Sequence, residues 1–554
     1  MNKNKHLLLF SSLGVFGLLV YAAVEENFLR QWRSIQRDVQ TENGPVEVRL
    51  RQIVVPELRV TDRCVTCHVG MAPGEMDLAG SPLAAAHPPV YHEIAEFGCT
   101  ACHSGQGHAT EQADAHGEVS HWPHPMIPLH YAEAGCGTCH THIQVPNQTQ
   151  LTLGQRLIER YDCLACHAMD GRGGTLRPGI AEGDKGPDLT PIGAAGYDSD
   201  WYEQHLAEHL AAADGAWHSC FGPIDPADRT AIEAYLDSRV GAPRLVEAKA
   251  LFHSLGCRGC HKIGGVGGDD GPDLTLVGQT DPALLDYSGV RGERTLVNWL
   301  VEHFREPDRV VPGSLMPDMG LTEEQIDLLT FYMLSLRRSV FPEAYWPKDR
   351  IRAERFGERE FATDGHTLYE TFCAACHGDR GQGLRYPGLP LFPAVGNPDL
   401  FAVASDDFLV ETIRLGRPGR RMPGFGKDRG GLRDDEIRRI VEYLREQSGV
   451  ATPDVSPEPQ RRVAADAMAG QQLYAAHCAG CHGAEGASDD APALNNPGLL
   501  SIASDSFLVE TISRGRRGTP MNGFAKSSPI HPTLSEEEIQ SIVAFIRTWE
   551  ESSP

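Results

Sequence analysis

Gly365-His-Thr-Leu-Tyr-Glu-Thr-Phe-Cys-Ala-Ala-Cys-His377 joins a helical pattern to the motif Cys-x-x-Cys-His. The chain has fifteen cysteines, and fourteen of them lie in seven copies of this motif. The copies are Cys64-Cys67-His68, Cys99-Cys102-His103, Cys136-Cys139-His140, Cys163-Cys166-His167, Cys257-Cys260-His261, Cys373-Cys376-His377 and Cys478-Cys481-His482. Every copy has its histidine, which indicates that the two cysteines and the histidine act together.

This motif attaches c-type haem. Two thioether bonds hold the porphyrin, and the adjacent histidine ligates the iron from one face. A redox disulfide or half of a zinc site is the alternative for a single copy, but seven complete copies favour haem. The sequence therefore predicts seven covalently bound haem c groups, with the seven motif histidines as proximal iron ligands.

Length and charge limit the class of protein. A chain of 554 residues predicts several domains rather than one. The formal net charge of -25 argues against nucleic acid as a partner and favours a positively charged patch on another protein. An ordinary acidic surface is the alternative explanation of the same charge.

The first residues predict a membrane helix. Lys3 and Lys5 precede an uncharged, mostly apolar run from residue 7 to residue 24. A helix of that length nearly spans the hydrocarbon core of a bilayer. The positive-inside rule places the N-terminus in the cytoplasm and the haem domains in the periplasm of a bacterium. A cleaved signal peptide ending near Val20-Tyr21-Ala22 is the alternative.

Four segments near the C-terminal side repeat one pattern: a helical stretch before the haem motif, and a closing amphipathic helix with an aromatic residue. Those aromatic residues are Tyr235, Tyr332, Tyr443 and Phe545. Three closing helices have start signals, Asp225-Pro226, Thr322-x-x-Gln325 and Ser535-x-x-Glu538. Phe408-Leu-Val-Glu-Thr-Ile413 recurs as Phe507-Leu-Val-Glu-Thr-Ile512, and Gly186-Pro-Asp-Leu-Thr190 recurs as Gly271-Pro-Asp-Leu-Thr275. His209 aligns with His303 in this comparison.

The predicted fold is mostly α. A membrane helix (1–24) leads into a loop-rich three-haem segment (25–150), which is too short per haem to build separate cores. Four small helical domains follow, and we number them repeats 1 to 4. Their ranges are 151–240, 245–340, 364–448 and 466–552.

The repeats resemble class I cytochrome c domains over roughly residues 152 to 552. The resemblance implies a first helix that crosses the closing helix at a small residue. Gly365 and Gly470 stand eight residues before the first haem cysteine, whereas Gly154 and Ala248 stand nine residues before it. The resemblance also implies that a proline carbonyl orients the proximal histidine, and Pro187 and Pro272 match that proline in the first two repeats.

Each iron needs a sixth ligand or an open site. A thioether raises the reduction potential of the iron and a second imidazole lowers it. Met316, Met422 and Met521 recur shortly before the closing helices and are the predicted distal ligands of repeats 2, 3 and 4. Met319 is the nearby alternative to Met316, and Met169 follows its own haem motif too closely to reach the other face.

Repeat 1 has no methionine at this register. Its stretch Gly215-Ala-Trp-His-Ser-Cys-Phe-Gly222 places His218 where the other repeats have methionine, which predicts two histidine ligands for the fourth haem. Cys220 as a thiolate ligand, His205 and His209 are the alternatives.

The three-haem segment has eight histidines besides its proximal ones and no visible methionine loop. His87, His92 and His116 are the predicted distal ligands, with His124 as the next choice and Met71 and Met126 as weaker competitors. The remaining histidines are His108, His121, His130 and His142.

The sequence around these first three motifs resembles anchored multihaem cytochromes that accompany bacterial quinol-oxidising cytochrome b complexes. This resemblance implies electron transfer from such a membrane partner to a soluble cytochrome or to a terminal oxidase or reductase. The alternative function is a multihaem redox enzyme acting on peroxide, a nitrogen oxide or thiosulfate, with Cys220 as a residue of interest.

Overall fold

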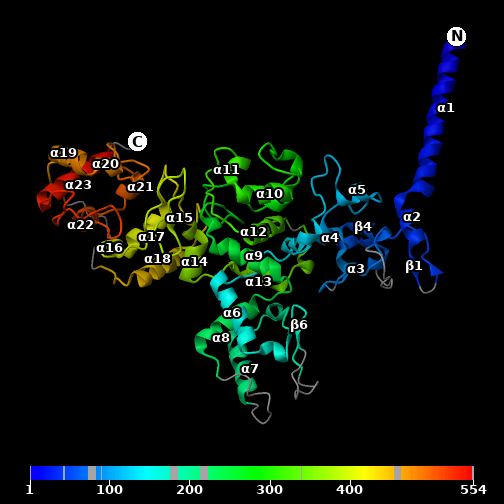
Figure 1. Ribbon diagram of the computed structural model, residues 1–554, viewed down its shortest axis with the longest axis horizontal. Helices are drawn as coiled ribbons and strands as arrows, with labels where there is room; N and C mark the ends of the chain where they lie inside the picture. Colours follow the sequence, from blue (N-terminus) through cyan, green and yellow to red (C-terminus); the bar gives the residue numbers. More distant parts are fainter. Residues whose placement is uncertain are drawn as a thin grey trace. The chain divides into compact units, whose positions relative to one another are not determined.

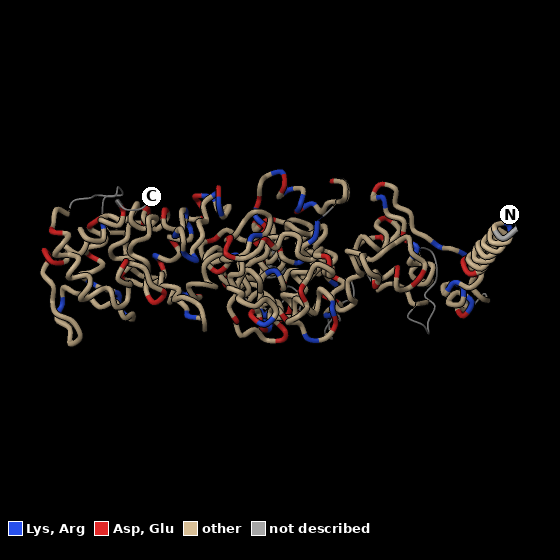
Figure 2. The backbone as a smooth tube through the Cα atoms, turned by 90° about the horizontal axis from the view of Figure 1, so that it is seen from above, with Lys and Arg blue, Asp and Glu red and all other residues tan. Residues whose placement is uncertain are grey.

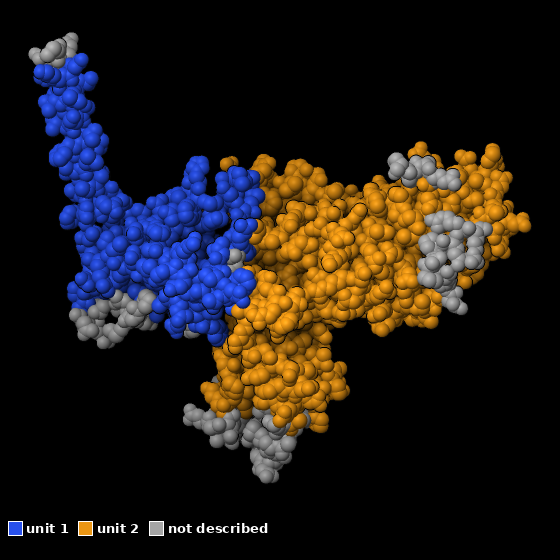
Figure 3. Space-filling model, turned by 180° about the vertical axis from the view of Figure 1, so that it is seen from behind, with its two compact units in different colours: residues 1–140, 278–285, 337–347 blue, residues 141–277, 286–336, 348–554 orange. Residues whose placement is uncertain are grey.

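The computed structural model describes residues 2–41, 44–72, 83–88, 90–174, 185–211, 223–338, 340–453 and 463–551. These residues are mostly helical with a few short strands, as the sequence predicts (Figure 1). The chain divides into two compact units (Figure 3). Unit 1 comprises residues 1–140, 278–285 and 337–347, and unit 2 comprises residues 141–277, 286–336 and 348–554.

Helix α1 (Asn2–Val24) is apolar along its length and exposed in the chain. It continues through a π-helical turn, η1 (Glu25–Leu29), into α2 (Gln31–Asp38). Figure 2 shows almost no charged residue along α1, whereas acidic and basic residues are scattered over the rest of the chain. Its most apolar window has a mean hydropathy of 2.3 and no buried part. Its length and composition are those of a membrane span, and a cleaved signal peptide shares both.

The rest of unit 1 has short elements and small apolar clusters. Two antiparallel ribbons pair β1 (Gln40–Thr41) with β2 (Gly44–Pro45) and β3 (Ile53–Val55) with β4 (Val60–Asp62). One buried cluster contains Ile53, Val55, Leu58, Val65 and Phe341, and another contains Val39, Val46, Val69 and Ala84. The helical turns are η2 (Pro56–Leu58), η3 (Cys64–Thr66), η4 (Val69–Met71), α3 (Ile94–Phe97), α4 (Thr100–His103), α5 (Gln112–His116), η5 (Leu129–Thr138), η12 (Pro282–Leu284) and η13 (Glu343–Tyr345), and η11 (Val277–Gln279) lies at the boundary with unit 2.

Unit 2 is built from pairs of crossing helices, one pair in each repeat. The pairs are α6 (Gln148–Arg160) with α8 (Pro226–Asp237), α9 (Pro243–Ser254) with α12 (Glu323–Ser335), α14 (Gly365–Phe372) with α18 (Asp434–Ser448), and α19 (Ala467–His477) with α23 (Glu536–Glu551). The predicted small residues lie at these crossings. A Cβ on Gly470 would lie 1.9 Å from the carbonyl oxygen of Ser541, so only glycine permits this approach.

The predicted helix starts are confirmed. Asp225 accepts a hydrogen bond from the backbone N–H of Ala227, with Pro226 as the first helical residue. Thr322 and Gln325 form a complete capping box. In the last closing helix Ser535 and Glu538 exchange the same two hydrogen bonds. Each cap satisfies backbone donors that the first turn of a helix leaves unpaired.

The remaining elements of unit 2 surround the helix pairs. They are η6 (Cys163–Ala165), β5 (Ala168–Met169), β6 (Arg172–Gly173), η8 (Ile192–Ala195), α7 (Ser199–Ala211), η10 (Cys257–Gly259), α10 (Leu296–Arg305), α11 (Pro307–Val310), α13 (Lys348–Phe356), α15 (Ala374–His377), α16 (Pro398–Phe401), α17 (Asp406–Leu415), α20 (Ala479–His482), α21 (Pro497–Leu500) and α22 (Asp505–Arg514). Repeats 3 and 4 each have a compact apolar core, centred on Tyr369 and Tyr474.

Repeats 3 and 4 contact each other reciprocally. The rings of Phe408 and Phe507, which occupy equivalent positions, lie 4.4 Å apart between centroids. Asn397 donates a hydrogen bond to the carbonyl of Arg517, and the equivalent Asn496 donates to the carbonyl of Pro418. Such matched contacts are typical of a two-fold interface, here formed inside one chain.

Candidate haem sites

All seven Cys-x-x-Cys-His motifs share one backbone hydrogen bond. In each motif the histidine N–H donates a hydrogen bond to the carbonyl of the first cysteine, with N···O distances of 2.9 to 3.0 Å. This turn brings the two cysteines and the histidine to one side of the chain. The motifs of the three-haem segment therefore have the same local geometry as those of the four repeats.

The proximal histidines of the repeats are oriented by proline carbonyls. His167 Nδ1 lies 2.9 Å from the oxygen of Pro187, and His261 Nδ1 lies 2.8 Å from the oxygen of Pro272, as the resemblance implies. In repeats 3 and 4 the corresponding contacts are His377 with Pro393 at 2.7 Å and His482 with Pro492 at 2.9 Å. Donation from Nδ1 to a carbonyl leaves Nε2 as the ligating nitrogen of each ring.

The shared Gly-Pro-Asp-Leu-Thr stretch also has a packing role. A Cβ on Gly186 would lie 2.4 Å from the ring of His167, and a Cβ on Gly271 would lie 2.5 Å from the ring of His261. The backbone can therefore pass this close to the imidazole only where the residue is glycine. This use of glycine explains why the stretch recurs in repeats 1 and 2.

In the three-haem segment, two predicted distal histidines face proximal ones. The ring centroids of His87 and His103 lie 6.0 Å apart, and those of His92 and His140 lie 6.1 Å apart. Two imidazoles that bind one metal from opposite sides, each with a metal–nitrogen bond of about 2 Å, have centroids roughly 6 Å apart. Both pairs therefore have the spacing that a shared iron requires.

The third predicted distal histidine lies near the remaining proximal one. Burial lowers the pKa of His68, and the neighbouring His116 lowers it further. The structure thus brings each of His87, His92 and His116 to a different proximal histidine. The next choice, His124, is exposed, and its carbonyl accepts hydrogen bonds from Gly105 and from the indole of Trp122.

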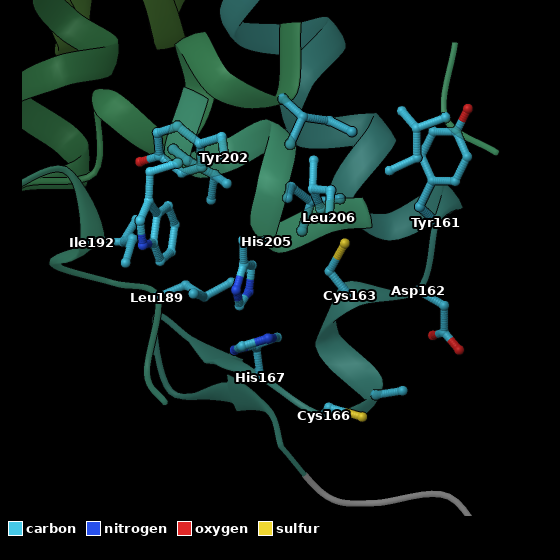
Figure 4. Close-up of a pocket in the computed structure, with 16 residues that line it drawn as sticks. Tyr161, Asp162, Cys163, Cys166, His167, Leu189, Ile192, Tyr202, His205 and Leu206 are labelled. Atoms are coloured by element: carbon cyan, nitrogen blue, oxygen red, sulfur yellow. The ribbon is translucent and has the colours of Figure 1, made fainter. Parts of the chain in front are cut away.

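The fourth haem motif lines an apolar pocket in repeat 1 (Figure 4). Cys163, Cys166 and His167 lie on one side of this pocket, and His205 of α7 points toward His167 from the other side. The walls between them are largely apolar, formed by residues that include Leu189, Ile192, Tyr202, Leu206 and Leu236. His218, Cys220 and the side chain of His209 lie outside the described residues, so the prediction of His218 as ligand stays a prediction.

The structure corrects the alignment of His209 with His303. His205 stacks on Trp201 with centroids 4.7 Å apart and planes 9° apart, and His303 stacks on Trp299 at 4.8 Å and 11°. His205 is therefore the counterpart of His303, one helical turn before His209. Sequence comparison missed this because the Leu-x-Glu-His matches outweighed the Trp-x-x-x-His spacing.

The corrected register bears on the sixth ligand of repeat 1. His205 stands thirteen residues before His218, and His303 stands thirteen residues before Met316. The spacing from the Trp-stacked histidine is thus the same for His218 as for Met316 in the sequence. The Trp-stacked histidine is a separate feature of both repeats, which sequence reasoning did not recognise.

The methionine loops of repeats 3 and 4 are held in the same way. The carbonyl of Met422 accepts a hydrogen bond from Arg417 N–H at 2.8 Å, and the carbonyl of Met521 accepts one from Arg516 N–H at 2.7 Å. In repeats 2 and 4 the methionine N–H also lies 3.2 Å from a hydroxyl two residues earlier, that of Ser314 for Met316 and that of Thr519 for Met521. Met169, which sequence reasoning excluded, is buried, and its sulfur lies 3.5 Å from the hydroxyl of Tyr235.

Several neighbouring haem motifs lie close to each other within a unit. In unit 1 the neighbouring thiol of Cys99 lowers the pKa of Cys64, and in unit 2 that of Cys376 lowers the pKa of Cys260. A Cβ on Gly135, next to the third motif, would lie 1.9 Å from the carbonyl of Cys102 in the second motif. Sulfurs that would carry thioether bonds of successive haems are therefore adjacent.

Known protein families match the repeats. Residues 245–337 and 467–550 match the cytochrome c family, and residues 360–444 match the family described as cytochrome c oxidase, cbb3-type, subunit III. Together with the haem-motif geometry, these matches decide the class. The chain is a multihaem c-type cytochrome. Its haem c is covalently bound, and the glycine cradles, oriented imidazoles and paired histidines fit that group.

Relatives of this multihaem cytochrome include subunits of oxidases. The cbb3-type cytochrome c oxidase subunit FixP of Bradyrhizobium diazoefficiens is 33% identical over 164 residues, which is 28% of this chain and 51% of the relative. The cbb3-type cytochrome c oxidase subunit CcoP of an Azospirillum species is 28% identical over 200 residues, 33% of this chain and 60% of the relative. The cytochrome thus spans about half to three fifths of the length of these relatives.

Among solved structures, the cytochrome is similar to a chain of the reducing HAO-like protein complex of Kuenenia stuttgartiensis. The identity is 20% and the TM-score is 0.22, with 33% of this chain and 94% of that chain covered. A score this low supports no argument about the arrangement of the repeats.

Proposed function

We propose that this cytochrome carries electrons through seven haems from a quinol-oxidising membrane complex of the cytochrome b type to a periplasmic acceptor. The acceptor is a soluble cytochrome or a terminal oxidase or reductase. Haem, when bound, supplies reversible one-electron chemistry at its iron. Helix α1 anchors the protein in the bacterial inner membrane, with the haem domains in the periplasm.

The contact between successive haem motifs is the observation that carries this proposal. Cys64 lies against Cys99 in unit 1, and Cys260 lies against Cys376 in unit 2. Electron tunnelling slows steeply with the distance between cofactors, so adjacent attachment points favour rapid transfer. An enzyme with one catalytic haem has no need of attachment sites that lie against each other.

The ligand types give the direction of transfer. His87, His92 and His116 supply imidazoles to the three-haem segment, and His218 does so in repeat 1, which lowers the potentials of these four sites. Met316, Met422 and Met521 supply thioethers in repeats 2, 3 and 4, which raises the potentials of these three sites. Electrons therefore run from the three-haem segment toward the last repeats.

The relatives support an oxidase or a similar acceptor at the high-potential end. FixP and CcoP are subunits of cbb3-type cytochrome c oxidases, and the cbb3 subunit family matches repeat 3. The likeness lies in part of the chain only, so the acceptor of this cytochrome is inferred from the chemistry of its last repeats.

Purification of the native complex from membranes tests the proposal. A cytochrome b-type complex is expected to copurify with the cytochrome. Added quinol is expected to reduce all seven haems in this preparation. Haem is counted from the spectrum of its pyridine adduct. Isolation without any membrane partner, or a preparation that quinol cannot reduce, would contradict the proposed donor.

A further inference from the structure

Repeat 2 has a histidine, His303 of α10, that stacks on a tryptophan as His205 does, and His205 points toward the haem-motif histidine of repeat 1 (Figure 4). Burial, together with the proximal His261, lowers the pKa of His303 to about 4. Its Nδ1 is buried and has no hydrogen-bond partner in the part of the chain that the structure describes. A buried ring nitrogen without a partner calls for an explanation, and an absent ligand partner is one.

The ring of His303 is held in place. It stacks on Trp299, and the indole N–H of Trp299 donates a hydrogen bond to the carbonyl of Asp286 at 3.0 Å. Thr295 caps the start of the same helix by accepting a hydrogen bond from Asn298 N–H. The imidazole is therefore positioned by a rigid helix, whereas Met316 comes from the loop that follows.

Repeats 3 and 4 have no histidine at this position. The N-cap residues of the corresponding helices are Thr295 in α10, Ser405 in α17 and Ser504 in α22. The residue eight positions after the cap is His303 in repeat 2, Ile413 in repeat 3 and Ile512 in repeat 4. The two isoleucines pack into the apolar cores of their repeats.

We propose that His303 is a second distal ligand of repeat 2, which binds the iron when Met316 leaves it. This inference rests on the proposed ligation by Met316. The exchange breaks one iron–sulfur bond and forms one iron–nitrogen bond through the lone pair of a neutral imidazole, with no electron or proton lost. Repeat 2 then has two states, a higher-potential one with methionine and a lower-potential one with histidine, and in both the iron stays closed to small ligands.

Carbon monoxide binding by the reduced full-length protein tests the exchange, because carbon monoxide binds at once only where the sixth position is open. Met316→Ala is expected to gain no carbon monoxide site relative to the unaltered protein, and the reduction potential of one haem falls. The double variant Met316→Ala with His303→Ala is expected to gain one site. Gain of one site by Met316→Ala alone overturns the proposal.

Met422→Ala in repeat 3 is the matched control. Ile413 stands where repeat 2 has His303, so this variant is expected to gain one carbon monoxide site. If the control variant gains no carbon monoxide site, the proposed ligation by methionine is wrong. That result would differ from a failure of the proposed exchange between Met316 and His303. His303→Ala alone is expected to leave carbon monoxide binding unchanged, and a site opened by it would make His303 the first ligand and contradict the proposal.

Discussion

The three-haem segment and the last two repeats hold the same motif in different surroundings. Two buried apolar clusters of unit 1 contain four and five residues, whereas the cores of repeats 3 and 4 contain twelve and eleven. In unit 1 two proximal histidines have a further histidine ring about 6 Å away. In repeats 3 and 4 a backbone hydrogen bond closes each methionine loop. Because the apolar clusters of unit 1 are small, we expect its fold to depend more on attached haem than the folds of repeats 3 and 4 do.

The largest expected effect is loss of the fold of unit 1 when a haem cannot attach. Replacing Cys99 and Cys102 by alanine prevents attachment of the middle haem, and the third motif packs directly on Cys102. Limited proteolysis of the full chain is expected to degrade unit 1 and to spare repeats 3 and 4. The paired control replaces Cys478 and Cys481, which is expected to leave unit 1 intact. Equal protease resistance of unit 1 in both variants would contradict the comparison.

The cores of the last repeats are sensitive to truncation instead. Phe401 is fully buried in the core of repeat 3. Phe401→Ala is expected to cost about 3–5 kcal/mol of unfolding free energy for this repeat. Phe356 of α13 is 71% exposed, and Phe356→Ala is expected to cost less than about 0.5 kcal/mol. Denaturant unfolding followed at the haem of repeat 3 measures both, and similar costs would refute the assigned core.

Replacing a predicted methionine ligand by histidine tests the predicted difference in reduction potential between the three-haem segment and the last repeats. Met422→His is expected to lower the potential of one haem, within the range of about 0.8 V that axial ligands span. The absorption band of one methionine–iron bond is expected to vanish at the same time. Met468→His is the control, because Met468 is 75% exposed in α19 and lies in no methionine loop. An unchanged titration of Met422→His would remove Met422 as a ligand.

The smallest expected effect comes from a partly buried, pH-dependent ion pair in repeat 3. A hydrogen bond with Glu370 raises the pKa of His366 above its usual 6.5, and the two side chains lie 3.2 Å apart. Because folding raises the pKa of His366, the ion pair stabilises the folded state fully at a pH below the unfolded pKa of 6.5. This stabilisation is lost as the pH rises through the pKa of His366 in the folded state. His366→Gln is expected to cost about 0.2–0.5 kcal/mol at acidic pH and nothing at alkaline pH. Unfolding curves at the two pH values test this, with Glu370→Gln as the matched change, and an equal cost at both would exclude the ion pair.

Features that depend on short spacings were predicted well from the sequence. The haem motifs, the caps at Asp225 and Thr322 and the proline carbonyls at Pro187 and Pro272 all act on neighbours within a few tens of residues. The choice of His87, His92 and His116 as distal ligands came from histidine density alone and stays a prediction, and the ring spacings of His87 and His92 to proximal histidines are compatible with it.

The sequence did not predict features that depend on contacts between repeats or on which residues of two repeats occupy equivalent positions in space. The contact of Cys260 with Cys376 joins motifs more than a hundred residues apart, and no local pattern encodes it. The equivalence of His205 and His303 became visible only through the stacked tryptophans, because the sequence offered a better letter match one turn later. The paired arrangement of repeats 3 and 4 likewise depends on side chains such as Phe408 and Phe507 meeting across the repeats.

A spectroelectrochemical titration of the purified full-length cytochrome, resolved haem by haem with magnetic circular dichroism, tests the central claim most directly. The account predicts seven haems in two groups. Four have two histidine ligands and low potentials, and three have histidine and methionine ligands and higher potentials. Seven haems that titrate together at one potential with one ligand set would contradict it.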